Sequence, residues 1–234
     1  MAKSRIVLIT GASRGIGKFL TEYYLSKGYK VIGCSRNNTE FTHENYIHYS
    51  LDVSNEMDVV RVIKEIIREK KRLDVLINNA GIASMNHSLL TPMTSFENIF
   101  KTNTFGTFLF SREAAKAMIR QDYGRIVNFS TVGVPFRLEG ECAYNASKAA
   151  IEMITRVMAR ELGNYSTTIN AIGPTPMKTD LIKNVPEDKI ENILSKQGIK
   201  HFASFEDIAN VIDFFLREES RMVTGQVVYL GGVG

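Results

Sequence analysis

A tyrosine and a lysine four residues apart, Tyr144 and Lys148, are the side chains best suited to chemistry in this sequence. They open a stretch with strong helical periodicity, 145–162, and residues four apart lie on one face of a helix. A free phenol ionises near pH 10, and a neighbouring cation lowers that pKa by favouring the phenolate, to about neutral in a suitable site. The pair therefore predicts a group that gives or takes a proton near neutral pH.

The spacing alone is weak evidence, because the chain contains it twice. Tyr23 and Lys27 repeat it on the first predicted helix, where we interpret them as surface side chains. Position separates the two pairs. Tyr144 lies beyond the carboxyl end of a predicted strand, 125–129, and parallel α/β sheets bind their ligands at that edge.

Strand-like and helix-like patterns alternate along the chain and must position these residues. The predicted strands are short runs, mostly apolar and β-branched, at 6–9, 30–33, 46–51, 73–77, 125–129, 168–172 and 226–230. Helical periodicity lies between them, near 16–28, 54–67, 95–120, 145–162 and 204–216, with Ser54 capping the second helix and Ser204 with Asp207 capping the last. This order predicts an α/β fold: a single-domain, Rossmann-like, doubly wound parallel sheet of about seven strands with helices on both faces, over residues 1–234.

The first predicted strand leads into a glycine-rich turn, Thr10 to Gly17, that opens a helix. Glycines allow a tight turn and close approach of the backbone to a pyrophosphate, and the helix end supplies unpaired N–H groups. The glycine spacing differs from the most familiar dinucleotide fingerprint, but its place after the first strand favours a cofactor loop. The predicted loop residues are Gly11, Ser13, Arg14, Gly15, Ile16 and Gly17.

The end of the second strand favours NADP(H) over NAD(H). NAD sites usually carry a carboxylate there that binds the ribose hydroxyls. This sequence has Arg36 instead, and no acid occurs before Glu40. The planar guanidinium of Arg36 suits a 2′-phosphate, and Arg14 is placed to meet the same group. Either one alone is as easily a surface arginine; together, with the acid missing, they favour NADP(H).

Taken together, the motifs resemble the classical short-chain dehydrogenase/reductase (SDR) family, most closely the 3-oxoacyl-[acyl-carrier-protein] reductase type. They are Thr10 to Gly17, Asn78-Asn79-Ala80-Gly81, Asn103, and Tyr144 with Lys148. The resemblance extends from about Arg5 to Gly232. Each motif is unspecific alone, but their combination in this order is highly specific.

The resemblance implies roles for several more residues. Asp52 and Val53 would flank the adenine; Asn79, Ala80 and Gly81 would line the cofactor groove; Pro174, Met177 and Thr179 would cover the nicotinamide; and Tyr144 and Lys148 would contact its ribose. Asn103 matches the catalytic asparagine of the family, which holds a water linked to the lysine.

Three departures from the family pattern concern the site. The usual serine thirteen residues before the tyrosine is replaced by Thr131, which carries an equivalent hydroxyl; a slip of one residue would select Ser130 instead. Thr175 stands where many relatives have glycine, and the link 37–45 is short. The last two lie beside the cofactor, whose geometry is therefore expected to differ in detail.

The expected reaction is reduction of a ketone or aldehyde by NADPH, with Asn103, Thr131, Tyr144 and Lys148 as the catalytic residues. A 3-oxoacyl thioester on an acyl carrier protein, as in fatty acid biosynthesis, is the leading substrate; a sugar, polyketide or steroid-like carbonyl is the alternative. The segment 175–204 is either an apolar cover over the site or helix faces packed on the body. A catalytically silent NADP-binding sensor or scaffold is a hypothesis of another class, and such a protein would need none of the catalytic residues.

Composition limits the partners. The 234 residues carry a net charge of +4, but Lys and Arg are spread along the chain, so we expect a mildly basic enzyme and no nucleic-acid binding. The two cysteines lack metal-ligand spacing, which predicts no metal site and fits a reducing cytoplasm. No apolar stretch approaches membrane-spanning length. Relatives usually form tetramers, so a homotetramer or homodimer is expected, with candidate contacts at Phe105, Phe108, Met118, Met153 and Met158.

Overall fold

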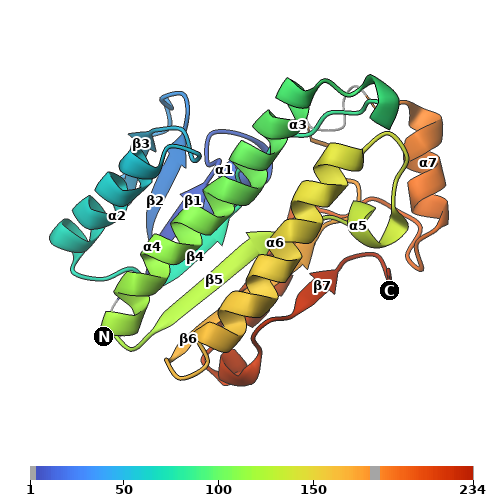
Figure 1. Ribbon diagram of the computed structural model, residues 1–234. Helices are drawn as coiled ribbons and strands as arrows, with labels where there is room; N and C mark the ends of the chain where they lie inside the picture. Colours follow the sequence, from blue (N-terminus) through green and yellow to red (C-terminus); the bar gives the residue numbers. More distant parts are fainter. Residues whose placement is uncertain (1–3, 180–184, 234) are drawn as a thin grey trace.

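One seven-stranded sheet forms the centre of the computed structural model, which describes residues 4–179 and 185–233 (Figure 1). The strands are β1 (Ile6–Thr10), β2 (Lys30–Ser35), β3 (Tyr46–Ser50), β4 (Val75–Asn78), β5 (Gly124–Phe129), β6 (Thr167–Gly173) and β7 (Val227–Tyr229). They pair in the order β3-β2-β1-β4-β5-β6-β7, and every pair is parallel. The predicted single-domain doubly wound fold is therefore confirmed.

Helices connect the strands and cover both faces of the sheet. They are α1 (Gly15–Ser26), α2 (Glu56–Lys70), α3 (Met93–Phe100), the π-helix η2 (Lys101–Phe105), α4 (Gly106–Arg120), α5 (Gly133–Phe136), α6 (Cys142–Glu161), α7 (Glu187–Ser195) and α8 (Phe205–Leu216), with 3₁₀ turns η1 (Ser88–Leu90) and η4 (Glu219–Met222). The helix predicted at 95–120 is thus three consecutive segments, because a wide π-turn interrupts it.

The caps at the helix starts confirm one prediction and correct another. Ser204 caps α8 in a capping box with Asp207, as expected. Asn55, and not Ser54, caps α2: the Asn55 side chain accepts from the Asp58 N–H, whereas the Ser54 hydroxyl donates to Asp52. An amide oxygen and a hydroxyl can both cap a helix, so the adjacent residues Ser54 and Asn55 compete for the cap position.

Alternate side chains of the strands build two cores, one on each face. Leu8 and Ile126 point towards α2, α4 and α6, which Figure 1 shows side by side in front of the sheet. Ile9 and Val127 point to the opposite core, which α1 and α8 complete. Because successive residues of a strand face opposite sides, strands that are apolar throughout must be covered on both.

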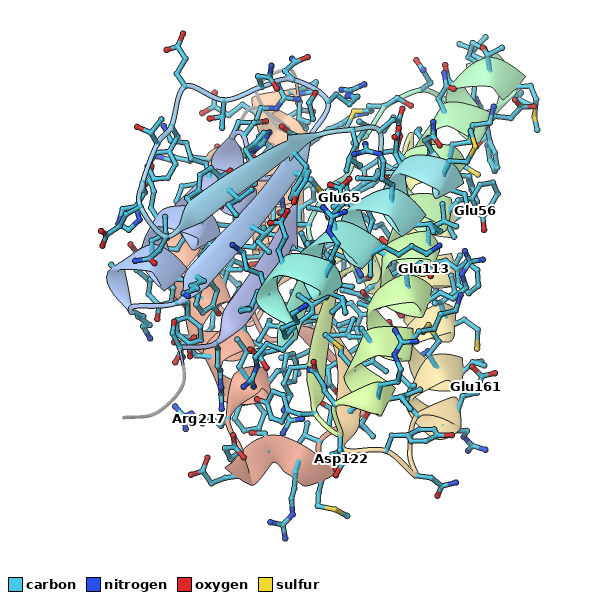
Figure 2. The ribbon with its side chains drawn as sticks, turned by 90° about the vertical axis from the view of Figure 1, so that its left-hand side faces the viewer. Glu56, Glu65, Glu113, Asp122, Glu161 and Arg217 are labelled. Atoms are coloured by element: carbon cyan, nitrogen blue, oxygen red, sulfur yellow. The ribbon has the colours of Figure 1, made fainter. Side chains whose placement is uncertain are left out.

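An ion-pair bridge fastens two helices of the front layer. The Arg112 guanidinium on α4 contacts Glu56 of α2 at 2.6 Å and Glu113 of its own helix at 2.7 Å. Figure 2 looks onto this side of the molecule and labels Glu56 and Glu113 on the two neighbouring helices. The bridge joins the start of α2 to α4, so it fixes these two helices of the front layer relative to each other.

Candidate active site

The carboxyl ends of the strands meet at one edge of the sheet, because all seven run in the same direction. The loops after the first six strands bring the predicted site residues to this edge: Gly11, Ser13, Arg14, Gly15, Ile16 and Gly17 after β1; Arg36 after β2; Asp52 and Val53 after β3; Asn79, Ala80 and Gly81 after β4; Thr131, and on the following helix Tyr144 and Lys148, after β5; and Pro174, Met177 and Thr179 after β6.

The loop after β1 has the features of a phosphate cradle. Gly11 and Gly15 adopt left-handed φ angles of 70° and 54°, which favour glycine. A β-carbon at Gly17 would clash with the Gly11 carbonyl, so only glycine, which has no β-carbon, allows the turn to close. Helix α1 begins without a side-chain cap and without an acid in its first turn. Its N–H groups are therefore available to an anion, and the chain fits a dinucleotide pyrophosphate here.

Asn79 holds this loop against the next strand. Its side-chain amide donates to the carbonyls of Thr10, at 3.0 Å, and Gly11, at 3.1 Å. The Thr10 hydroxyl in turn accepts from the Ala80 N–H at 3.0 Å. The predicted groove residues Asn79 and Ala80 thus fix the strand ends β1 and β4 relative to each other.

Arg14 and Arg36 are both exposed at this edge and, within the described residues, neither contacts a carboxylate. The Ser50 hydroxyl fixes the Arg36 backbone by donating to its carbonyl at 2.8 Å. Val53 is buried against Gly106, whose β-carbon would lie 2.7 Å from a Val53 methyl group. The Val53 side chain therefore points into the protein and away from the edge of the sheet.

Lys148 lies under the centre of the site. Its side chain is 4% exposed, its ammonium donates to the Phe129 carbonyl at 2.8 Å, and it lies 5.8 Å from the centre of the Tyr144 ring. A β-carbon at Gly81 would lie 3.6 Å from the ammonium, so glycine there leaves room beside it. Burial lowers the pKa of Lys148 from 10.5 to about 8.

The phenol of Tyr144 is less acidic than the sequence predicts. Burial raises its pKa above the usual value, the nearby Glu141 carboxylate raises it further, and the Thr131 hydroxyl lowers it. Lys148 is not among the groups that shift this pKa, which differs from the expectation that the lysine makes the phenol acidic. Burial of the ring is the largest cause of the raised pKa, and the Lys148 ammonium donates its hydrogen bond to the Phe129 carbonyl instead of to the phenol.

The structure brings Thr131, and not Ser130, to the tyrosine. The Thr131 hydroxyl faces Tyr144 and accepts from the Gly133 N–H at 3.2 Å. The Ser130 hydroxyl donates to the buried Glu152 carboxylate at 2.5 Å. Threonine thus occupies the position of the family serine, and the neighbouring serine serves a different contact.

Asn103 lies in the π-helix η2 and is completely buried. Its Oδ1 accepts from the Ile82 N–H at 2.9 Å, and its Nδ2 donates to the Ile82 carbonyl at 2.9 Å and to the Ser147 hydroxyl at 3.0 Å. Both ends of the side-chain amide are therefore engaged in contacts within the protein. The side chain fixes the loop after β4 against α6.

The loop after β6 is tied to the turn that follows α7. The Thr175 hydroxyl accepts from the buried Gln197 amide. This contact explains why a threonine stands where many relatives have glycine. Met177 is buried, and its carbonyl accepts from the Thr179 N–H at 2.7 Å. Beyond it, 180–184 lie outside the described residues, and the remainder of the 175–204 segment contains α7 with Ile193 buried against the body.

Comparison with known proteins decides the family. The sequence profile described as short chain dehydrogenase matches residues 5–190. The chain belongs to the short-chain dehydrogenase/reductase family. It is an oxidoreductase that uses a nicotinamide cofactor on CH–OH or C=O groups.

Relatives of this short-chain dehydrogenase are found along its whole length. It is 31% identical over 236 residues to the 3-oxoacyl-[acyl-carrier-protein] reductase FabG of Buchnera aphidicola subsp. Schizaphis graminum, covering 98% of this chain and 97% of the relative. Among solved structures, levodione reductase matches with a TM-score of 0.89 at 26% identity, covering 97% and 96% of the two chains. The aldohexose dehydrogenase of Thermoplasma acidophilum, in ligand-free form, matches with a TM-score of 0.87 at 28% identity, covering 99% and 94%.

Sequence reasoning missed four groups at the site of this short-chain dehydrogenase: the Phe129 carbonyl, Ser147, Glu141 and Glu152. A main-chain carbonyl leaves no trace in a sequence. Ser147 and Glu152 had a usable signal, since they lie one turn from Tyr144 and Lys148 on the same helix. Glu141 precedes Tyr144 by three residues, but Arg137 and Glu139 are charged as well, so charge alone does not single it out.

The second tyrosine–lysine pair has a structural role in the same protein. The Tyr23 hydroxyl and the Lys27 ammonium both contact the Asp213 carboxylate, each at 2.6 Å, and so join α1 to α8. They lie away from the carboxyl edge, and Lys27 remains half-exposed, as the interpretation of a surface pair predicts.

In the part of the chain that the structure describes, no helix is long and apolar enough to cross a membrane, and the same part contains no cluster of three potential metal ligands.

Proposed function

We propose that this short-chain dehydrogenase reduces a ketone or aldehyde with NADPH. The proposal is carried by one juxtaposition: the buried Lys148 amine lies 5.8 Å from the Tyr144 ring, and Thr131 is near enough to the phenol to shift its pKa, at the edge where α1 begins uncapped. When bound, the reduced nicotinamide supplies a hydride to the carbonyl carbon. The loop Gly11–Gly17 would hold the pyrophosphate, and Pro174, Met177 and Thr179 would cover the nicotinamide.

Tyr144 acts as the general acid that protonates the developing alkoxide. Its raised pKa keeps the phenol protonated at neutral pH, which is the form that a reduction requires. Thr131 donates a hydrogen bond to the same oxygen and orients the carbonyl. Lys148 binds the ribose hydroxyls, and its pKa of about 8 lets it pass a proton towards the phenol. Asn103 would support the relay of water that resupplies this proton.

Arg36 and Arg14 are proposed to select NADPH by binding its 2′-phosphate from two sides. Both guanidiniums are exposed at the edge where the strands end, and no acid occurs between β2 and Glu40 to bind an unmodified ribose. Asp52 and Val53 would contact the adenine.

The first proposed substrate is a 3-oxoacyl thioester. The proposal rests on curated relatives that are 3-oxoacyl-[acyl-carrier-protein] reductases and align over nearly the whole chain. The net charge of +4 suits an acidic carrier protein.

One observation favours a sugar carbonyl as the second candidate. Glu141 lies near the Tyr144 phenol, and its carboxylate is close enough to Gly133 that a β-carbon there would be 3.3 Å from it. Lys189 of α7 reaches the same wall, 3.6 Å from the Met85 sulfur. A half-buried carboxylate beside the reacting oxygen suits a substrate that donates hydrogen bonds from hydroxyls, and one similar structure is an aldohexose dehydrogenase.

The proposed assembly is a homotetramer built on the outer faces of α4 and α6. Phe105, Phe108 and Met153 are 53%, 40% and 57% exposed on these faces. Met118 and Met158, the other two candidate contacts, are buried in the core of the subunit and cannot contribute. An exposed apolar stripe on two parallel helices is typical of a subunit interface. Light scattering on the wild type and a Phe108→Glu variant tests the proposal: a tetramer that dissociates in the variant supports it, and a monomeric wild type refutes it.

A steady-state assay of NADPH consumption tests the reaction and its substrate together. The panel contains acetoacetyl thioesters, aldoses, keto sugars and an unfunctionalised cyclic ketone. Turnover of any member supports the reaction, and the best substrate decides between the two candidates. NADPH binding without turnover of any carbonyl would instead identify the silent sensor.

A further inference from the structure

The buried Glu152 carboxylate is a charged group for which the proposed reaction has no use. Glu152 is 4% exposed and lies on α6, one turn after Lys148. Its Oε1 accepts hydrogen bonds from the Ser130 hydroxyl and the Tyr229 hydroxyl, both at 2.5 Å. Arg156, half-exposed on the same helix, lies 3.7 Å from the other carboxylate oxygen. A buried carboxylate is costly, so two short hydroxyl contacts show a site built to keep it.

The first donor belongs to the segment that carries the catalytic hydroxyl. Phe129, Ser130 and Thr131 are consecutive, and each is attached to α6 by a different group. The Phe129 carbonyl accepts from Lys148, the Ser130 hydroxyl donates to Glu152, and the Thr131 hydroxyl faces Tyr144. Ser130 lies directly before Thr131, so its hydroxyl contact helps to fix the peptide that carries the Thr131 side chain.

The second donor belongs to the strand beside the cofactor loop. Tyr229 of β7 packs its ring on Gly173, where a β-carbon would clash with it, and Gly173 is followed by Pro174. The Leu230 N–H donates to the Gly173 carbonyl at 3.0 Å. Burial and the Glu152 contact raise the pKa of Tyr229, so its hydroxyl stays a donor. Glu152 therefore links the end of β5, which leads to Thr131, with Tyr229 of β7, whose ring packs on the residue before Pro174.

We propose that Glu152 is a positioning residue: through Ser130 it holds the Thr131 hydroxyl in register with Tyr144, and through Tyr229 it holds the loop that begins at Pro174. This inference rests on the proposed carbonyl reduction. It assigns Glu152 no contact with substrate or cofactor. A shift of a few tenths of an ångström at Thr131 is enough to weaken a hydrogen bond that matters only in the transition state.

The first test compares Glu152→Leu with Glu152→Gln. Glutamine retains an oxygen that accepts from both hydroxyls, whereas leucine removes it at similar volume. We expect Glu152→Leu to lower kcat at least about tenfold with little change in KM for NADPH, and Glu152→Gln to keep kcat within about threefold of wild type. If the carboxylate serves only stability, its replacement lowers Tm but leaves kcat per folded molecule unchanged in both variants. That result would overturn the proposal.

Ser130→Ala and Tyr229→Phe separate the two arms and remain informative if the leucine variant fails to fold. Each removes one hydroxyl and little volume. We expect Ser130→Ala to lower kcat, and Tyr229→Phe to raise KM for NADPH, by about threefold to tenfold each. Wild-type values of both constants in both folded variants would refute the positioning role.

Hydrogen exchange separates a failure of this inference from a failure of the proposed reaction. Glu152→Leu and Ser130→Ala should speed amide exchange in the peptide spanning 129–134, with or without turnover. If exchange is faster in these variants but the wild type reduces no carbonyl, the anchoring by Glu152 stands and the proposed reaction is rejected. Unchanged exchange in both variants would reject the anchoring.

Discussion

The Lys148 ammonium lies 5.8 Å from the centre of the Tyr144 ring and donates its hydrogen bond to the Phe129 carbonyl instead of to the phenol. The two residues therefore share a helix face without sharing a proton directly. Burial raises the pKa of the phenol and lowers the pKa of the amine. The phenol is therefore the weaker acid of the two, as expected of a general acid that must hold its proton until the reduction requires it. The tyrosine keeps its proton until an alkoxide develops, and the lysine titrates close to the working pH.

Replacing Tyr144 by phenylalanine should remove the general acid and leave the cofactor loop intact. We expect kcat to fall by about 10² to 10⁴, because positioned proton transfer contributes a factor of that size. Titration of NADPH fluorescence should give an unchanged Kd. Tyr23→Phe is the matched control, since Tyr23 belongs to the structural pair with Lys27 and should affect Tm alone. Full activity of the Tyr144 variant would disprove its role.

The pH dependence of stability should reveal the buried Lys148. Its folded pKa of about 8 is below the ordinary 10.5, so between these values the unfolded chain binds more protons and stability rises with pH. Below pH 8 the folded protein bears the whole cost of the buried charge, about 3 kcal/mol. Lys148→Met should therefore raise the free energy of unfolding at pH 7 by about 2 kcal/mol, after losing the bond to Phe129. Urea unfolding at pH 7 and pH 10.5 checks this, and the gain should be absent at the higher pH.

Thr131→Val keeps the shape of the side chain and removes its hydroxyl. Loss of one hydrogen-bond donor to a developing oxyanion should lower kcat by about 10² to 10³. Thr131→Ser restores the hydroxyl and should recover most of the activity. Equal activity of the valine and serine variants under saturating substrate would show that another group polarises the carbonyl.

Arg36→Ala should reduce the preference for NADPH over NADH. A hydrogen bond to a charged group contributes about 1.5 to 3 kcal/mol, so the ratio of kcat/KM for the two cofactors should fall by about tenfold to a hundredfold. Arg68→Ala, on the exposed side of α2 beside Glu69, is the control and should leave the ratio unaltered. An unchanged ratio in Arg36→Ala would place the 2′-phosphate elsewhere.

Gly17→Ala should destabilise the phosphate loop, because the β-carbon of alanine would clash with the Gly11 carbonyl. A main-chain carbonyl cannot turn aside as a flexible side chain can. We expect a loss of about 2 to 4 kcal/mol in the free energy of unfolding and no measurable NADPH binding. Gly163→Ala, at the end of α6, has looser surroundings and should cost less than about 1 kcal/mol. Thermal unfolding of the two variants side by side decides the question.

The sequence predicted the sheet well because buried parallel strands have a strong local signal. The runs around Leu8, Ile77 and Val127 are apolar on both faces and can lie only between two helical layers. Helix ends were less certain, because Ser54 and Asn55 both carry capping groups and only the surrounding geometry chooses between them.

The site was predictable in position but not in electrostatics. Counting residues selected Thr131 and left Ser130 as the choice after a slip of one residue, whereas the direction of each hydroxyl depends on the backbone after β5. The pKa of Tyr144 depends on burial and on Glu141, and neither follows from the spacing to Lys148. Glu152 went unnoticed because its partners, Ser130 and Tyr229, are distant in the chain.

The π-turn at Lys101–Phe105 makes the site sensitive to chain length. A π-turn contains one residue more than the α-helical path it replaces. Here the wide turn buries both Asn103, against Ile82, and Thr104, whose hydroxyl donates to the Ser147 carbonyl at 3.1 Å. Deleting one residue would let the helix wind regularly and rotate α3 by about 100° relative to α4. Loss of a single codon would therefore damage this wall of the active site more than exchange of any one exposed side chain on it.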